Sequence, residues 1–310
     1  MNTMRWPLFF SLVALTAFRP APAADALFWH TDLEVAKIEA RNTGKPILSL
    51  RMLGKLTDEL SCANSRYFRT ALYANPEVAA LMREKFVLHW SSERAVPVIT
   101  IDFGDGRTIK STITGNSAHY VLDDQGRVID VIPGLYSPAA FMTQLRAAPS
   151  ITPALHAMAA ERLERAKNVV MLPRGRAPAS AAVRIAVSKA IVESPMLGAP
   201  AEEGALAMDA PVILAKESIA RMREENPSLD EATFSAMVQR FQQNIARDTA
   251  RNENDLHARI HRYLASRDRP NFAETNAWVY SELFATPASD PWLGLHDDTV
   301  YTGLENGGVQ

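Results

Sequence analysis

Hydrophobic and polar positions change their period near residue 150. Before that point, helix-like and strand-like patterns alternate, whereas the later part is almost entirely helical in pattern. In the first part the pattern predicts a helix over 32–42, ended by Gly44, and a buried strand over 46–53. Asn75 followed by Pro76 predicts another helix start, because Asn caps helices and Pro fits the first helical position. We therefore expect an α/β N-terminal region followed by a mainly α-helical C-terminal region.

Further elements of the first part follow from apolar runs and from turn residues between them. They are a helix over 62–74, a strand over 86–90, a hairpin over 98–113 that turns at Gly104-Asp105-Gly106, a second hairpin over 119–132 that turns at 123–126, and a closing helix over 141–145.

The second part contains helices separated by two connectors rich in Pro, Gly and Ala, over 172–180 and 195–211. Ser228 and Glu231 have the spacing of a capping box and predict a helix start there. The apolar residues that follow share one helical face, which predicts packing against a core: Phe234, Met237, Val238, Phe241 and Ile245.

The first 23 residues have the pattern of a secretory signal peptide. Arg5 precedes an apolar run over 6–18, and Ala21-Pro22-Ala23 is a small-residue cleavage motif, with Ala24-Asp25-Ala26 as a second option. The run of about 13 residues is shorter than the roughly 20 that cross a bilayer. We expect an exported protein, periplasmic or secreted, with no membrane anchor after cleavage. The expected organisation is a signal peptide over 1–23, an α/β domain over 24–149 and a helical domain of unknown role over 150–310.

Composition narrows the functional classes. The chain has 310 residues, of which 47% are hydrophobic and 22% charged, as in globular proteins. Its 33 basic and 35 acidic residues give a net charge of −2, which does not favour nucleic-acid binding. The single cysteine, Cys62, excludes an intramolecular disulfide and a four-cysteine zinc site. The sequence has no nucleotide-binding loop and no serine-hydrolase motif.

Cys62 stands where a predicted strand leads into a predicted helix. Unpaired N–H groups and the helix dipole stabilise a thiolate at such a position. Ser61 is a candidate cap for this helix, and Arg66 and Arg69 add positive charge within it. Cys62 is therefore a candidate nucleophile, and the alternative is a small buried hydrophobic residue.

Several residues follow Cys62 at a characteristic spacing, namely Tyr73, Glu77-Val78 and Phe86-Val87. Gly44-Lys45-Pro46 precedes it at the entry to the predicted central strand, and Leu122-Asp123-x-x-Gly126, Gly134 and Phe141 follow later. In these motifs the chain resembles the thioredoxin-like superfamily over residues 27 to 146. The resemblance implies a central mixed sheet flanked by helices, with thiol–disulfide chemistry at Cys62.

The chain departs from the family pattern at three places. The motif reads Cys62-Ala63-Asn64-Ser65, so Ser65 replaces the resolving cysteine and no intramolecular dithiol cycle is possible. Ser117 stands where the family has a cis-proline, and we expect a trans bond there. Residues 54–60 lengthen the segment between the predicted strand and Cys62. They form a loop that can cover the thiol or reposition it. The resemblance implies catalytic roles for Cys62 and Ser65 and substrate binding by Asn64 and Ser117, with no cofactor and no metal.

Two functional hypotheses follow from these residues. In the first, the protein is a monothiol oxidoreductase whose Cys62 forms a mixed disulfide with a protein partner or a small thiol, resolved by an external thiol. In the second, it is a redox-inactive thioredoxin-fold protein that serves as a protein-binding or structural module. Peroxide reduction is less favoured, because Glu59 lies three residues before Cys62 and a carboxylate there disfavours a thiolate. Exposure of Cys62 distinguishes the first two hypotheses.

His257 and His261 have a spacing that can place two imidazoles on one metal ion. The glutamate of the metalloprotease motif is missing, and Arg259 between them favours a solvated face, so we do not expect a metal site. Four other histidines stand alone in the sequence and are expected to be structural, namely His30, His89, His119 and His156. Under the resemblance, His89 and His119 lie on strands that flank the site.

Overall fold

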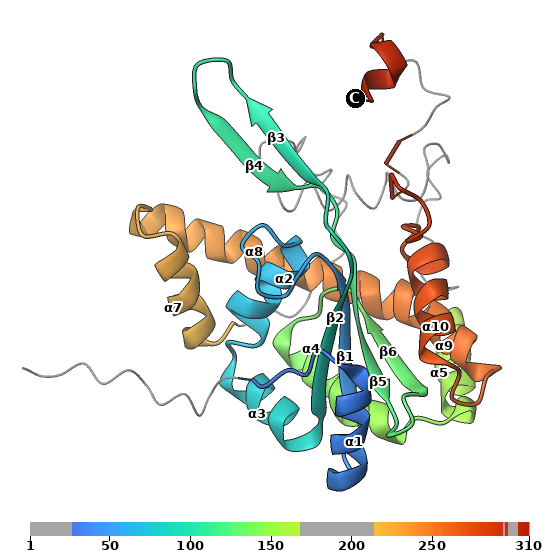
Figure 1. Cartoon of the computed structure of the whole chain (residues 1–310). Coiled ribbons are helices and arrows are strands. Elements are labelled where there is room, and N and C mark those ends of the chain that lie inside the picture. Colours follow the sequence, from blue (N-terminus) through green and yellow to red (C-terminus); the bar gives the residue numbers. More distant parts are fainter. Residues whose placement is uncertain (1–26, 168–213, 294, 297–302, 310) are drawn as a thin grey trace, which may run out of the picture.

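The computed structural model describes residues 27–167, 214–293, 295–296 and 303–309. Its N-terminal half is a mixed α/β region with a four-stranded sheet, and its C-terminal region is mainly helical, as the pattern predicts (Figure 1). The expected signal peptide and the two connectors over 172–180 and 195–211 lie outside the described residues. Within the described residues, no helix has the length and apolar character to cross a membrane.

The sheet has the strand order β2-β1-β5-β6. Strand β1 pairs in parallel with β2 and antiparallel with β5, and β5 pairs antiparallel with β6. The two central strands, β1 and β5, carry buried side chains on both faces, as in a sheet that helices cover on both sides. The strands are β1 (Ile47–Leu53), β2 (Val87–Arg94), β5 (Ser117–Leu122) and β6 (Val128–Pro133).

Helix ends in the N-terminal half follow their local signals. Asp32 caps α1, and Gly44 ends it with φ at 68°, a left-handed conformation that glycine adopts without strain. Asn75 accepts hydrogen bonds from the first N–H groups of α3, and Pro76 is its first residue, as predicted. The elements are α1 (Leu33–Thr43), α2 (Ala63–Tyr67) continued by the π-helical η2 (Phe68–Leu72), α3 (Pro76–Lys85), α4 (Pro138–Ala147) and η3 (Ala148–Ser150).

The predicted hairpin over 98–113 is also confirmed. Strands β3 (Val98–Asp102) and β4 (Thr108–Thr112) form a separate two-stranded antiparallel sheet that projects away from the main sheet (Figure 1).

In the C-terminal region one predicted cap is wrong. Helix α8 begins at Glu231 and its cap is Asp230, whose carboxylate accepts a hydrogen bond from the Thr233 N–H, so Ser228 lies outside the helix. The predicted apolar face of α8 is confirmed, because its residues join the core. The elements are α5 (Pro153–Lys167), α7 (Lys216–Glu225), α8 (Glu231–Arg251), η4 (Asn252–Leu256), α9 (His257–Ala265), α10 (Phe272–Trp278), η5 (Val279–Leu283) and η6 (Glu305–Gly308).

Helices from both halves of the chain cover the two faces of the sheet. Alternate residues of a strand point to opposite faces, and β1 divides accordingly. Leu48 and Leu50 belong to a core that includes Phe234 of α8, whereas Ile47 belongs to a second core with Ile260 of α9 and Tyr280 of η5. Burial of each such side chain contributes about 1.5–3 kcal/mol to stability, so the helical region is held to the sheet by extensive apolar contact.

Candidate functional site

Cys62 occupies the N-cap position of α2, and its side chain is 0% exposed. The sequence correctly places it at a helix start, but Ser61 does not cap this helix. Arg69 instead donates a hydrogen bond to the Ser61 hydroxyl at 3.3 Å, and Arg66 donates to the Ser61 carbonyl at 2.8 Å. The two arginines thus hold the backbone that leads into Cys62.

Two segments enclose Cys62. A Cβ added at Gly115 would lie 2.5 Å from the Cβ of Cys62 and 3.3 Å from its Sγ, so only glycine permits this approach. On another side, the inserted loop folds onto the helix, where the Ser65 hydroxyl donates to the Leu56 carbonyl at 3.2 Å. Leu56 itself is buried in the same core as Cys62. Ser65 therefore fastens this loop to α2.

The structure brings Asn64 and Ser117 into direct contact. The Asn64 amide donates a hydrogen bond to the Ser117 hydroxyl at 2.7 Å, and both side chains are buried. The peptide bond before Ser117 is trans, as expected, like every peptide bond in the described part of the chain. The four residues that the sequence assigned to the site are Cys62, Asn64, Ser65 and Ser117, and all four are buried here.

The C-terminal region contacts the loop beside Cys62 directly. The amide of Asn116 donates to the Thr286 hydroxyl at 2.9 Å, and the Tyr280 hydroxyl donates to the Asn116 carbonyl at 3.3 Å. The same carbonyl accepts a hydrogen bond from the Leu53 N–H at 3.1 Å. Burial raises the pKa of Tyr280 well above its ordinary value, so the hydroxyl stays protonated and can donate.

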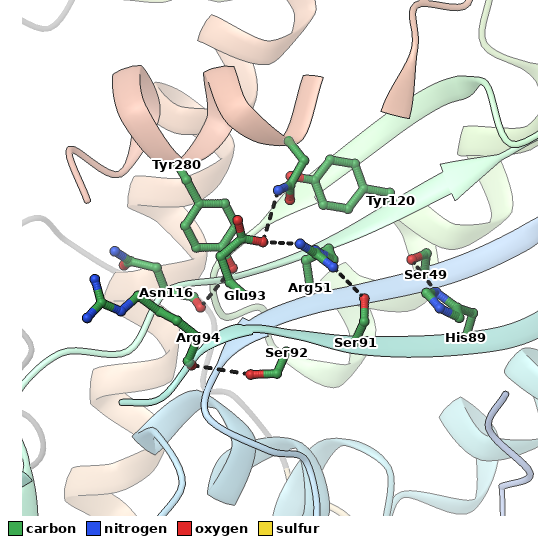
Figure 2. A network of polar contacts seen from close by, with 11 residues as sticks. Ser49, Arg51, His89, Ser91, Ser92, Glu93, Arg94, Asn116, Tyr120 and Tyr280 are labelled. Atoms are coloured by element: carbon green, nitrogen blue, oxygen red, sulfur yellow. Dashed lines mark hydrogen bonds and ion pairs between the residues drawn. The ribbon is translucent and has the colours of Figure 1, made fainter. Parts of the chain in front are cut away.

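A polar network extends this contact toward the middle of the sheet (Figure 2). Arg51 of β1 forms an ion pair with Glu93 of β2 and donates to the Ser91 hydroxyl at 2.7 Å. Glu93 also accepts a hydrogen bond from Asn276 of α10 at 3.0 Å, and the Asn276 carbonyl oxygen accepts one from Tyr120 at 3.0 Å. Sequence reasoning missed this network, since it joins side chains that are far apart in the chain.

The two histidines on strands near the site have other partners. His119 Nε2 lies 2.6 Å from the Tyr73 hydroxyl, within hydrogen-bond distance, and its Nδ1 is buried with no hydrogen-bond partner in the described residues. Burial lowers the pKa of His119 to about 3. His89 lies 2.8 Å from the Ser49 hydroxyl, and burial, followed by the charge of Arg51, lowers its pKa to about 4. Both histidines are therefore neutral core residues.

A second polar cluster contains the two histidines of the His257–His261 spacing. His257 and His261 are buried, at 2% and 8% exposure, so the expected solvated face is wrong. Helix α9 packs against α5 and β6, and only Arg259 between the two histidines reaches outward, where it donates to the Glu282 carbonyl. The sequence signal that was missed is Asp130, a carboxylate in the middle of the apolar strand Val128-Ile-Asp-Val-Ile132.

Four side chains meet in this cluster, from β6, α5 and α9. His156 and His261 face each other with their Nδ1 atoms 2.7 Å apart, and His257 Nε2 lies 3.3 Å from Asp130 Oδ1. One ligand atom each from Asp130, His156 and His261 lies within 4.8 Å of the other two. These are the residues of the described chain that can hold a metal ion.

The charges in the cluster are coupled. Burial raises the pKa of Asp130, but the adjacent His257, through its charge and its hydrogen bond, counteracts burial, and the pKa of Asp130 stays below the ordinary value. Burial, reinforced by the charge of His257, lowers the pKa of His261 to about 3. The carboxylate is therefore ionised at neutral pH while His261 is neutral, which is the state in which both bind metal ions.

Comparisons with known proteins add no assignment. No family model matches the chain, and no curated protein and no solved structure matches it either.

Proposed function

We propose that this chain is an exported, redox-inactive protein with a thioredoxin-like domain that acts as a protein-binding or structural module. The strand order β2-β1-β5-β6, with β5 antiparallel to the other three strands, supports the thioredoxin-like fold. The observation that carries the redox-inactive assignment is the complete burial of Cys62.

A thiol that attacks a disulfide must reach the partner's sulfur. Exchange rates depend on the thiolate fraction and on access. Gly115 approaches Cys62 closely, and no surface of Cys62 is exposed. A cysteine in this position contributes packing as a small apolar residue.

The C-terminal region supports the same conclusion. In the resemblance, the segment around Ser117 is the edge that receives substrate. Here the neighbouring Asn116 is hydrogen-bonded to Tyr280 and Thr286 of the same chain. A partner protein would therefore bind to a different surface of the module.

The monothiol hypothesis keeps one observation in its favour. Cys62 is the N-cap of α2, a position at which helix N–H groups and the helix dipole stabilise a thiolate. In this alternative, the thiolate attacks a partner disulfide, forms a mixed disulfide and releases the partner's other sulfur as a thiolate. This monothiol reaction requires the C-terminal region to move away from the 115–117 loop.

The test is the rate at which Cys62 of the mature protein is alkylated as a function of pH, with Cys62→Ser as the blank. We expect slow labelling that becomes fast only in denaturant. A matched variant, Tyr280→Phe with Thr286→Val, removes the two hydroxyl contacts to Asn116. Its labelling rate measures how far the C-terminal region restricts access to Cys62. Fast labelling of the wild type, with a thiol titrating well below about 8.5, would overturn the proposal and establish the monothiol.

A further inference from the structure

Asp130, His156 and His261 come from three elements that are distant in the sequence and converge in the protein interior. Asp130 lies on β6, His156 on α5 and His261 on α9, and all three side chains are buried. Helix α5 packs against α9, and α9 packs against β6, so the cluster stands where the helical region meets the sheet.

One atom in this cluster is unsatisfied. Asp130 is 0% exposed, and its Oδ1 accepts hydrogen bonds from the Val131 N–H at 2.8 Å and from His257 at 3.3 Å. Its Oδ2 is buried and has no hydrogen-bond partner among the described residues. A buried carboxylate oxygen without a partner is costly, and such atoms generally meet a donor, a water molecule or a cation.

We propose that Asp130, His156 and His261 bind a first-row divalent transition-metal ion, with Zn²⁺ as the representative ion. Two imidazole nitrogens and one carboxylate oxygen are a ligand set that such ions prefer, whereas Mg²⁺ and Ca²⁺ prefer oxygen ligands only. The ion satisfies Asp130 Oδ2 and takes the Nδ1 atoms of the two histidines.

The observed distances require a small adjustment on binding. With bonds of about 2.0–2.1 Å, ligand atoms around a tetrahedral ion are roughly 3.4 Å apart. The two Nδ1 atoms are 2.7 Å apart, a distance at which one ring donates a hydrogen bond to the other. Binding therefore replaces this hydrogen bond and separates the rings by less than an ångström.

His257 acts as a positioning residue. Its Nε2 contacts the Asp130 carboxylate, and its ring stacks on the His261 ring with centroids 4.2 Å apart. His156 is oriented in a similar way, because its Nε2 lies 3.0 Å from the Ile129 carbonyl, which directs Nδ1 toward the site. Such partners fix the orientation of metal ligands.

Three protein ligands leave a fourth position on a tetrahedral ion. A cavity of about 100 Å³ borders the cluster on the side of His156, and its other walls include Ile129, Leu264 and Arg269. We place the route by which the ion enters, and by which a water molecule or a small anion reaches the fourth position, on this side of the cluster, because His156 lines the cavity. The bound ion then joins β6 to α5 and α9 and stabilises the docked helical region.

The experiment uses the full mature chain, treated with a chelator and then titrated with Zn²⁺ by calorimetry and with Co²⁺ by visible absorption. We expect one equivalent of each ion to bind, a tetrahedral Co²⁺ spectrum and a higher unfolding temperature with Zn²⁺. Asp130→Asn and His261→Gln are expected to weaken binding more than 100-fold, and His257→Asn 10-fold to 100-fold, as loss of an orienting partner does.

His89→Gln is the matched control, since His89 is equally buried but lies outside the cluster. It is expected to bind Zn²⁺ as the wild type does. Absence of a Co²⁺ spectrum in the wild type would overturn the proposal without reference to any variant. Wild-type affinity in both Asp130→Asn and His261→Gln would overturn it too, because the ion would then be bound elsewhere.

Discussion

Gly115 lies so close to Cys62 that a Cβ on residue 115 would be 2.5 Å from the Cβ of Cys62. We predict that Gly115→Ala lowers the free energy of unfolding by about 1–3 kcal/mol, the usual effect of overpacking a core. Urea denaturation followed by circular dichroism measures this change.

The double variant Cys62→Gly with Gly115→Ala provides the control. It moves the Cβ from one side of the contact to the other, so its loss of stability should be smaller than the sum of the two single losses. Strictly additive effects would mean that the two residues do not contact each other as described.

The Arg51–Glu93 ion pair is partly withdrawn from solvent, with 22% of the Arg51 side chain and 10% of the Glu93 side chain exposed. We predict that Arg51→Leu destabilises the protein by about 1–3 kcal/mol, because the half-buried Glu93 carboxylate loses its charged partner. The matched control is Arg165→Leu, which removes an exposed ion pair with Glu161 and should change stability by less than about 0.5 kcal/mol. Equal effects of the two substitutions in urea denaturation would contradict the buried network.

Local signals in the sequence predicted most of the elements in the described residues. Asn75 with Pro76 marked a helix start and Gly44 a helix end, because capping depends on a few neighbouring residues. The same reasoning failed at Ser228, where Asp230 stands two residues later and offers a competing cap. The order of the elements was therefore predictable, but the choice between adjacent caps was not.

Burial in the candidate sites depended on distant parts of the chain. Arg259 between His257 and His261 indicated an exposed face, yet α5 and β6 cover both histidines. Likewise, nothing near Cys62 in the sequence indicates that Tyr280 and Thr286 bind the neighbouring loop. Periodicity reports which face of an element is apolar, but it does not identify the element that packs on that face.

Asn64 and Ser117 form a hydrogen bond in which both partners are buried. We predict that Ser117→Ala lowers the free energy of unfolding by about 1–3 kcal/mol, since the Asn64 amide then loses its acceptor in the interior. Ser117→Thr keeps the hydroxyl and serves as a comparison for the hydrogen bond, although it adds a methyl group. A loss below about 0.5 kcal/mol for Ser117→Ala would show that the pair contributes little beyond its apolar contacts.

The pKa of His89 predicts a specific loss of stability in acid. Burial, with the charge of Arg51, lowers this pKa from 6.5 to about 4 in the folded protein. Below pH 6.5 the unfolded chain therefore binds a proton at His89 that the folded protein does not bind. The free energy of unfolding should fall as the pH falls from 6.5, and the contribution of His89 should level off below about pH 4.

At 1.36 kcal/mol per unit, His89 accounts for a loss of about 3 kcal/mol across this window. Replacing it by Gln removes that titration, whereas carboxylates and other histidines such as His119 titrate in both proteins. Urea denaturation at several pH values should therefore give a shallower pH dependence for His89→Gln than for the wild type. Parallel curves would mean that His89 is protonated to the same extent in the folded and unfolded states, which is incompatible with its burial beside Ser49 and Arg51.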